Sequence, residues 1–271
     1  MLYVIGNPIK HSYSPIIHNS WIAKYGIKTK YNKLLVKESE IGGIIEDIRR
    51  RKIIGINVTL PYKETILSYL DTLHESARKS GAVNTIYRNG LNKVEGANTD
   101  GIGFCSYLEK DLSFDFYGKD ILILGAGGSA KGIISELVKR EVSQITIMNR
   151  TIQSAEKILE IYKKCNTRII AKKWDTEKVD NKVKLVVNTT SFGMKEGEQI
   201  NLNTTGLSRS TIFCDIIYNP PETLLLRTLR SKGFTAVNGL GMLIRQAAAS
   251  FKFWFNIEPN PNDIRKVEKK N

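Results

Sequence analysis

The chain has 271 residues, of which 41% are hydrophobic and 25% are charged. This is the composition of an ordinary globular protein, so a disordered or fibrous chain is excluded. The 41 lysines and arginines outnumber the 27 aspartates and glutamates, and the formal net charge is +14 at pH 7. One or two domains are expected at this length, because a domain typically has roughly 100–200 residues.

The cysteines and the apolar runs indicate the cellular setting. Cys105, Cys165 and Cys214 stand far apart and form no CxxC pair. Neither a metal site nor a disulfide scaffold is therefore expected, and a reducing compartment is favoured. Apolar runs are far shorter than the roughly 18 residues of a membrane span, and the first residues lack the basic start of a signal peptide. We expect a cytoplasmic protein with no membrane partner.

The positive charge leaves nucleic acid open as a partner. The densest basic runs are residues 49–52 and a C-terminal cluster of Arg265, Lys266, Lys269 and Lys270. A site for single-stranded nucleic acid would interleave aromatic side chains with such charges, and neither run has an aromatic neighbour. Solvated helix ends explain the runs better, so no nucleic-acid partner is expected. A positive field would equally suit an anionic small molecule.

The first hundred residues alternate short apolar runs with helical patterns. Strands are expected at residues 2–5, 31–36 and 53–60, followed by a pair at 82–87 and 92–97 around the turn Asn89-Gly90. Helices are expected from Ser14, as an N-cap before Pro15, to Gly26, then over 38–51 and again after Pro61.

A second alternating unit begins near residue 101. Strands are expected at residues 120–124, 145–148, 185–188 and 212–216, and helices at 130–140, 154–164 and 242–255. Strands that alternate with helices indicate a parallel sheet with helices on its faces. The sequence therefore predicts an α/β protein of two units with a terminal helix.

A glycine turn joins the strand at 120–124 to the helix that follows it. Gly125 permits the tight turn, and Gly127 lets the backbone approach a pyrophosphate, with Ala126 between them. Gly128 and Ser129 open the helix, whose terminal N–H groups would meet phosphates. A bare structural turn is the alternative, but strand, turn and helix occur in the order that a dinucleotide site requires.

The end of the next strand indicates which dinucleotide is bound. It reads Asn149-Arg150-Thr151, where an NAD enzyme would place an acidic residue against the ribose hydroxyls. A guanidinium can bind a 2′-phosphate, which an acid would repel. NADP is therefore predicted as the cofactor, unless Arg150 is simply a surface arginine at a strand end.

Polar side chains gather in the first unit. Ser12 and Ser14 stand at a helix start, which suits a carboxylate. Asn57 and Thr59 share one face of a strand, which is expected to point away from the core, and Lys63 follows. Asn84 and Asp100 stand beside glycines. Each of these side chains could have a purely structural role, but together they fit a polyol substrate.

Short segments that extend from residue 4 to about residue 255 resemble shikimate dehydrogenases. In the first unit they are His11-Ser12-Tyr13-Ser14-Pro15, Asn57-Val58-Thr59-Leu60-Pro61-Tyr62-Lys63, Gly81-Ala82-Val83-Asn84-Thr85 and Asn98-Thr99-Asp100-Gly101. In the second they are Gly125-Ala126-Gly127-Gly128-Ser129, Asn149-Arg150-Thr151, Asn188-Thr189-Thr190, Asp215-Ile216-Ile217-Tyr218-Asn219-Pro220 and Asn238-Gly239-Leu240-Gly241-Met242-Leu243, with Gln246.

The resemblance implies an oxidoreductase acting on a CH–OH group, which reduces 3-dehydroshikimate to shikimate with NADPH on the pathway to chorismate and the aromatic amino acids. It implies a substrate and catalytic domain over residues 1–100, a Rossmann-like NADP domain over 101–238, and a helical segment over 239–271 that packs on the substrate domain. The partners implied are small molecules, and the protein is expected to be a monomer or a homodimer.

The resemblance also implies a role for each candidate residue. Ser12 and Ser14 bind the substrate carboxylate, and Lys63 and Asp100 form the catalytic pair. Other residues that line the substrate are Asn57, Thr59, Asn84, Tyr218 and Gln246. The segments 125–129 and 149–151 bind NADP, with Ile216 and Gly239 near the nicotinamide and Glu75 as a further cofactor contact.

Two questions stay open at this point. Ser154 stands where the family often has a second basic residue, so mixed use of NADP and NAD is possible, with Lys157 as a substitute. Reduction of a ketone requires a proton donor, but a carboxylate beside Lys63 keeps it charged and makes it a poor base, so either Lys63 or Asp100 could carry the proton. Alternative functions are a quinate/shikimate dehydrogenase and a non-catalytic NADP-binding regulator.

Overall fold

The computed structural model describes residues 1–174, 178–195 and 197–264, and the C-terminal basic cluster from Arg265 to Lys270 lies outside them. The chain divides into two compact units. The first contains Met1–Ser106 and the segment from Leu243 onward, and the second contains Tyr107–Met242. Among the described residues, no helix is both long and apolar enough to cross a membrane.

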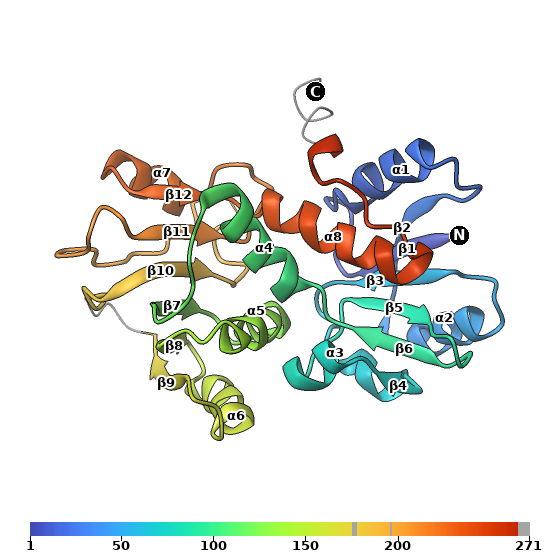
Figure 1. Ribbon diagram of the computed structural model, residues 1–271, viewed down its shortest axis with the longest axis horizontal. Helices are drawn as coiled ribbons and strands as arrows, with labels where there is room; N and C mark the ends of the chain where they lie inside the picture. The colour runs from blue at the N-terminus through green and yellow to red at the C-terminus, as the bar shows by residue number, and fades with distance from the viewer. Residues whose placement is uncertain (175–177, 196, 265–271) are drawn as a thin grey trace. The chain divides into compact units, whose positions relative to one another are not determined.

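The first unit is built on a six-stranded mixed sheet (Figure 1). Its strands are β1 (Leu2–Gly6), β2 (Tyr31–Leu35), β3 (Gly55–Val58), β4 (Thr72–Leu73), β5 (Thr85–Arg88) and β6 (Val94–Ala97), in the order β2-β1-β3-β5-β6-β4. β1 pairs in parallel with β2 and β3, whereas β5 pairs antiparallel with β3 and β6. The expected strand pair around Asn89-Gly90 is confirmed as β5 and β6.

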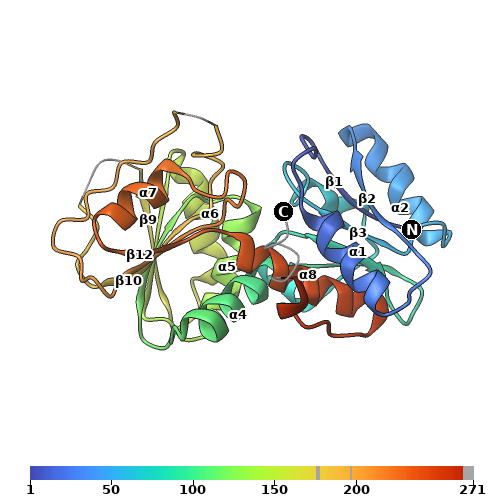
Figure 2. The same cartoon turned by 90° about the horizontal axis from the view of Figure 1, so that it is seen from above.

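Helices cover both faces of this sheet. α2 (Ile41–Arg49) packs its isoleucines on one face, against Ile56 and Val58 of β3. Strand residues alternate between the two faces, so Asn57 points to the opposite face, where α1 (Ser14–Lys24) and α8 (Leu240–Phe255) lie (Figure 2). The first unit also contains the 3-10 turns η1 (Glu38–Glu40) and η2 (Thr65–Tyr69) and the short α3 (Glu75–Ser80).

The second unit contains a parallel six-stranded sheet in the order β12-β11-β10-β7-β8-β9. Its strands are β7 (Asp120–Leu124), β8 (Gln144–Asn149), β9 (Arg168–Lys173), β10 (Val183–Asn188), β11 (Ile212–Asp215) and β12 (Thr235–Val237). With β7 taken as the first strand, this is the Rossmann order 3-2-1-4-5-6. The connections run outward from β7 in both directions, so the strand order reverses between β7 and β10.

Right-handed crossovers determine which face of the sheet each helix of the second unit covers. α5 (Gly128–Lys139) and α6 (Ile152–Tyr162) connect strands that step from β7 to β9, so they lie on one face. α7 (Leu224–Ser231) connects β11 to β12 in the opposite direction and packs Leu225, Leu226 and Leu229 on the other face (Figure 1). α4 (Asp100–Leu112) begins in the first unit and ends in the second.

Several expected boundaries are corrected. The helix expected over 38–51 opens with the 3-10 turn η1, and the helix expected after Pro61 is only the 3-10 turn η2. α5 and α6 begin two residues earlier than expected, at Gly128 and Ile152. The elements that were not expected are α3, β4, α4, β9, α7 and β12. The roles assigned to residues 1–100, 101–238 and 239–271 remain predictions.

Candidate active site

An ion pair between Lys63 and Asp100 is the strongest chemical feature of the first unit. Lys63 Nζ lies 2.5 Å from Asp100 Oδ2, and the two side chains are only 12% and 6% exposed. A lysine ammonium is a hydrogen-bond donor only, whereas an ionised carboxylate is an acceptor only. The pair therefore combines a proton donor with a fixed negative charge in a nearly buried setting.

Main-chain contacts fix both residues of the pair. Lys63 follows β3 in a turn, and its carbonyl oxygen accepts a hydrogen bond of 2.7 Å from the Val83 N–H. Asp100 is the first residue of α4, where the positive end of the helix dipole favours a carboxylate. Its own N–H donates to Asn98 Oδ1 at 3.0 Å, which helps to anchor the start of the helix.

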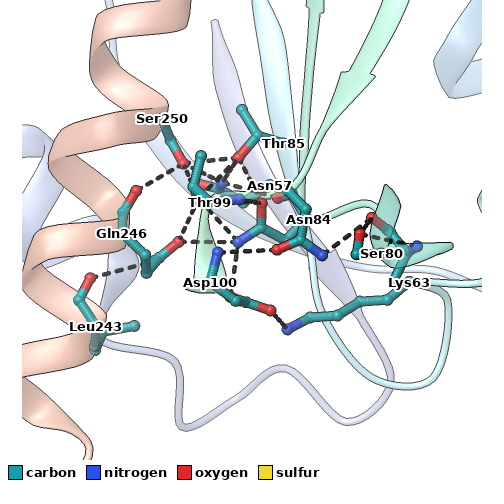
Figure 3. A network of polar contacts seen from close by, with 12 residues as sticks. Asn57, Lys63, Ser80, Asn84, Thr85, Thr99, Asp100, Leu243, Gln246 and Ser250 are labelled. Atoms are coloured by element: carbon teal, nitrogen blue, oxygen red, sulfur yellow. Dashed lines mark hydrogen bonds and ion pairs between the residues drawn. The ribbon is translucent and has the colours of Figure 1, made fainter. Parts of the chain in front are cut away.

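Asn84 connects this pair to the rest of the site (Figure 3). Its Nδ2 donates to Asp100 Oδ1 at 2.7 Å and to Thr99 Oγ1 at 2.9 Å, and its Oδ1 accepts from the Thr99 N–H at 2.8 Å. The same Nδ2 lies 3.3 Å from Gln246 Oε1. Asn84 is 2% exposed, so this arrangement is held away from bulk water.

α8 contributes Gln246 and, one turn later, Ser250 to the same network (Figure 3). Ser250 Oγ lies 2.7 Å from Thr85 Oγ1 and 3.1 Å from Thr99 Oγ1, and it accepts from Asn57 Nδ2 at 3.1 Å. Asn57 was expected on a polar face directed away from the core. That expectation is wrong, because Asn57 is 5% exposed and lies beneath α8.

The structure thus brings together five of the predicted residues: Asn57, Lys63, Asn84, Asp100 and Gln246. It also adds the hydroxyl groups of Thr85, Thr99 and Ser250, which the sequence analysis did not propose as site residues. Thr85 and Thr99 stood inside segments already singled out. Ser250 could have been found from its spacing of four residues after Gln246, which places both side chains on one face of a helix.

Ser12 and Ser14 lie at the start of α1. Ser14 is the first helical residue and Tyr13 is the N-cap, so the expected N-cap role of Ser14 is wrong. Ser12 Oγ instead accepts from the Ser14 N–H at 3.3 Å, and the two hydroxyl groups are 3.2 Å apart. Ser14 is 5% exposed and Ser12 is half-buried. Two adjacent hydroxyl groups at a helix start remain suited to a carboxylate.

Two other candidates of the first unit form different contacts. Thr59 follows β3, is half-buried, and donates its N–H to Ile5 O at 2.9 Å. Glu75 begins α3, is exposed, and forms an ion pair of 2.6 Å with Lys79. Its assignment to the cofactor stays a prediction.

The glycine turn of the second unit has the geometry that a phosphate site requires. Gly125 has φ +104°, and a Cβ there would lie 2.7 Å from Thr189 Oγ1, so only glycine fits. Gly127 is the exposed N-cap of α5, and a Cβ there would meet open space. Ala126 and Gly128 are buried, and Ser129 is half-buried. The first N–H groups of α5 have no partner within the helix, so they are available as donors to a phosphate.

The segment Asn149-Arg150-Thr151 leaves the sheet beside this turn. The Gly125 N–H donates to Met148 O at 2.8 Å, which ties the glycine turn to the end of β8. Asn149 Nδ2 donates to Thr151 O at 2.8 Å, and Arg150 is exposed. Arg150 therefore follows the end of β8 at the carboxyl edge of the sheet, where dinucleotides bind in this fold.

Ile216, Tyr218 and Gly239 lie on the loops that follow β11 and β12 in the second unit. The Gly239 N–H donates to Ile217 O at 3.0 Å, and a Cβ at Gly239 would collide with the Ile216 backbone. Close contact between the two loops therefore requires glycine at this position.

Asp215 anchors the first of these loops. It is completely buried, and its carboxylate accepts from Thr223 Oγ1 at 2.8 Å, Asn188 Nδ2 at 3.0 Å and the Ile217 N–H at 3.1 Å. Burial raises the pKa of Asp215, and these three hydrogen bonds oppose that shift. Asp215 and Asn188 are further residues that the sequence analysis did not assign to the site, although both stood in quoted segments.

The two units offer complementary chemistry. The first holds a cation–carboxylate pair among amides and hydroxyls, and the second fits a dinucleotide through the glycine turn and Arg150. Within the ranges that the structure describes, no group of three or more His, Cys, Asp or Glu side chains could hold a metal ion. The strand order and the glycine turn define the class of dinucleotide-binding proteins with a Rossmann fold.

Comparison with known proteins identifies the family. The substrate-binding domain of shikimate dehydrogenase matches residues 4–86, the shikimate/quinate 5-dehydrogenase domain matches 107–203, and the shikimate 5′-dehydrogenase C-terminal domain matches 239–267. The NADP(+) shikimate dehydrogenase of Pelagibacter ubique is 44% identical over 256 residues, which cover 94% of this chain and 93% of that protein. The chain belongs to the shikimate dehydrogenase family.

Two solved structures extend the comparison. The Thermus thermophilus shikimate 5-dehydrogenase, in complex with NADP(H) and shikimate, superposes with a TM-score of 0.86 at 29% identity, covering 99% of this chain and 98% of that one. Ligand-free 5-ketofructose reductase of a Gluconobacter strain superposes with a TM-score of 0.89 at 28% identity, covering 99% and 97%. The shared fold therefore extends to an enzyme named for a different substrate, the keto sugar 5-ketofructose.

Proposed function

We propose that this protein catalyses the reversible reduction of 3-dehydroshikimate to shikimate with NADPH. The observation that carries the proposal is the Lys63–Asp100 pair, oriented by Asn84 inside a nearly buried network of amides and hydroxyls. The matches to curated NADP(+) shikimate dehydrogenases along nearly the whole chain support it.

The chain's own groups would supply binding and proton transfer. NADPH, when bound, supplies the hydride. Negative charge then develops on the ketone oxygen, and the Lys63 ammonium can stabilise that charge and donate a proton. Asp100 keeps Lys63 in place and can accept a hydrogen bond from a substrate hydroxyl. In the reverse direction the neutral Lys63 amine would take the proton that the hydroxyl loses as the ketone forms. Lys63 is the better proton donor of the two because an ionised carboxylate only accepts.

The remaining substrate contacts follow from chemical complementarity. Asn57, Asn84 and Gln246 offer amide groups to ring hydroxyls, and the hydroxyls of Ser12 and Ser14 suit the carboxylate. Thr59 and Tyr218 are proposed as further substrate contacts.

The cofactor would be held by the second unit. The segment from Gly125 to Ser129 binds the pyrophosphate at the N-terminus of α5, and the segment from Asn149 to Thr151 binds the adenosine ribose and its 2′-phosphate. Ile216 and Gly239 are proposed beside the nicotinamide.

The likeness to 5-ketofructose reductase favours one second candidate, an oxidoreductase with a broader range of cyclic polyols. Quinate belongs to this range, and relaxed use of NAD is part of the same alternative because Arg150 is not followed by a basic residue at Ser154. The network of amides recognises hydroxyl groups in general, so the substrate carboxylate and ring geometry must supply the discrimination.

Initial rates of the purified protein separate these candidates. Shikimate and quinate are each assayed with NADP and with NAD, and 5-ketofructose is assayed with NADPH. The proposal expects shikimate with NADP to have the highest kcat/KM. Equal or higher kcat/KM with quinate or 5-ketofructose would assign the broader activity, and no turnover with any pair would reject both. Analytical ultracentrifugation measures the oligomeric state, which is predicted to be a monomer or a homodimer. The cytoplasmic location stays a prediction.

A further inference from the structure

The carboxyl end of β9 brings a lysine to the proposed 2′-phosphate site. β8 and β9 pair in parallel, and Lys173, the last residue of β9, is in register with Asn149, the last residue of β8. Neighbouring strands are roughly 4.8 Å apart. The backbone of Lys173 therefore lies beside the residue that directly precedes Arg150.

The pairing continues for one more residue. The Trp174 N–H donates to Asn149 O at 3.0 Å, so the two segments leave the sheet side by side. Because paired residues point to the same face of a sheet, Lys173 shares the face of Asn149. Lys172 is in register with Met148 and points to the opposite face, where Met148 packs in the core. Both lysines are exposed.

A 2′-phosphate carries more charge than one guanidinium neutralises. Ser154 is neutral, and Lys157 lies in the second turn of α6, six residues after the N-cap Thr151. At 1.5 Å per residue this is about 9 Å along the helix axis. The backbone of Lys173 lies one strand spacing, roughly 4.8 Å, from that of Asn149, and its long side chain can extend beyond the strand end.

We propose that Lys173 is a specificity-determining residue, which supplies the second positive charge to the 2′-phosphate of NADP beside Arg150. This inference rests on the proposed use of NADP. It differs from the expectation for Lys157, because it assigns the charge to the neighbouring strand rather than to the helix that follows Arg150.

Binding of two nucleotides tests the contact without turnover. Titration calorimetry measures Kd for adenosine 2′,5′-bisphosphate and for 5′-AMP, which lacks the 2′-phosphate. Lys173→Ala should raise Kd for the bisphosphate about three- to tenfold, between the effects of an exposed ion pair and a charge-assisted hydrogen bond. Kd for 5′-AMP should not change. Lys173→Glu should have a larger effect, and raising the salt from about 0.05 M to about 0.5 M should diminish both.

Lys172→Ala is the matched control, because it removes the same charge from the adjacent position on the opposite face. The proposal expects the control to retain the wild-type ratio of the two Kd values. An unchanged ratio of Kd for the bisphosphate to Kd for 5′-AMP in Lys173→Ala, or a ratio raised equally in both variants, would overturn it.

Steady-state kinetics separate this inference from the proposed function. Lys173→Ala should lower kcat/KM with NADP relative to NAD by a similar factor when shikimate is the substrate. A wild-type protein that oxidises shikimate with NADP, combined with an unchanged ratio in the variant, would overturn only the role of Lys173. A wild-type protein that binds the bisphosphate through Lys173 but oxidises no shikimate would reject the proposed function and support the contact.

Discussion

Asn84 Nδ2 lies 2.7 Å from Asp100 Oδ1, while Asp100 Oδ2 lies 2.5 Å from Lys63 Nζ. One amide thus orients the carboxylate that holds the lysine. Asn84 lies just before β5 and Asp100 begins α4, so the carboxylate is fixed from a strand and from a helix start. Side chains fixed in this way lose little freedom when a substrate binds, which favours catalysis.

Ser14 provides a test of carboxylate binding. Because Tyr13 is the N-cap of α1, Ser14→Ala should leave the melting temperature nearly unchanged and raise KM for shikimate. The loss of one hydrogen bond to a charged group, about 1.5–3 kcal/mol, corresponds to roughly a ten- to hundredfold rise in KM. Thermal unfolding and initial rates measure the two effects. An unchanged KM would remove Ser14 from the substrate site.

Gly127 provides a test of pyrophosphate binding at the glycine turn. A methyl group at this exposed N-cap meets open space, so Gly127→Ala should still fold, and the poorer N-cap should cost about 1 kcal/mol in stability. The same methyl group would stand where the pyrophosphate approaches, so Kd for NADP should rise about tenfold, the order of one lost charge-assisted hydrogen bond. Titration calorimetry with NADP checks this. Wild-type affinity would place the pyrophosphate elsewhere.

Arg150 should carry most of the preference for NADP. Arg150→Ala removes a charge-assisted contact of about 1.5–3 kcal/mol, which corresponds to roughly a ten- to hundredfold rise in KM for NADP. KM for NAD, which has no 2′-phosphate, should change little. The ratio of kcat/KM for the two cofactors is the measurement. If the variant keeps the wild-type ratio, the guanidinium does not recognise the phosphate.

His18 makes stability depend on pH. Its ring is fully buried and stacks on Tyr31 at a centroid distance of 4.3 Å, and burial lowers its pKa from 6.5 to about 3. The unfolded chain therefore binds a proton at this ring near pH 6.5, whereas the folded protein does not until about pH 3. Stability should be fully present above pH 6.5 and fall as the pH drops toward 3, by up to about 1.4 kcal/mol per pH unit.

Urea unfolding between about pH 7.5 and about pH 5 measures this dependence. His18→Phe keeps an aromatic ring that cannot titrate, so its stability should decline less steeply toward low pH. His11→Phe changes an exposed histidine and serves as the control. Parallel pH profiles for the wild type and His18→Phe would show that the buried ring does not set the slope.

The sequence predicts the inner part of the fold well because its signals are local. β7, β8 and β10 are apolar runs in the middle of the second sheet, and α5 and α6, which follow β7 and β8, have a strong apolar period. β9 was not expected because it is an edge strand ending in two exposed lysines, and β12 has only three residues. η2 shows the apolar spacing of an α-helix, but its five residues form only a 3-10 turn.

The site was predictable where a residue type is unusual for its surroundings. Lys63, Asn84 and Asp100 are charged or amide groups beside strands and glycines, and the resemblance identified them together. Thr85, Thr99 and Ser250 could not be separated from ordinary hydroxyls, because threonine is common in strands and serine is unremarkable in a helix. Only the tertiary contacts with Asn57 and Asn84 show that these hydroxyls belong to the network.

Turnover of Lys63→Ala tests the central claim most directly. Loss of a positioned acid–base group should lower kcat for shikimate oxidation about 10²–10⁴-fold, while Kd for shikimate, measured by calorimetry, changes only modestly. Lys52→Ala removes a lysine that is 65% exposed and paired with Asp47 at 3.3 Å, and it should retain wild-type turnover. A Lys63→Ala variant that folds and turns over shikimate at nearly the wild-type rate would contradict the account.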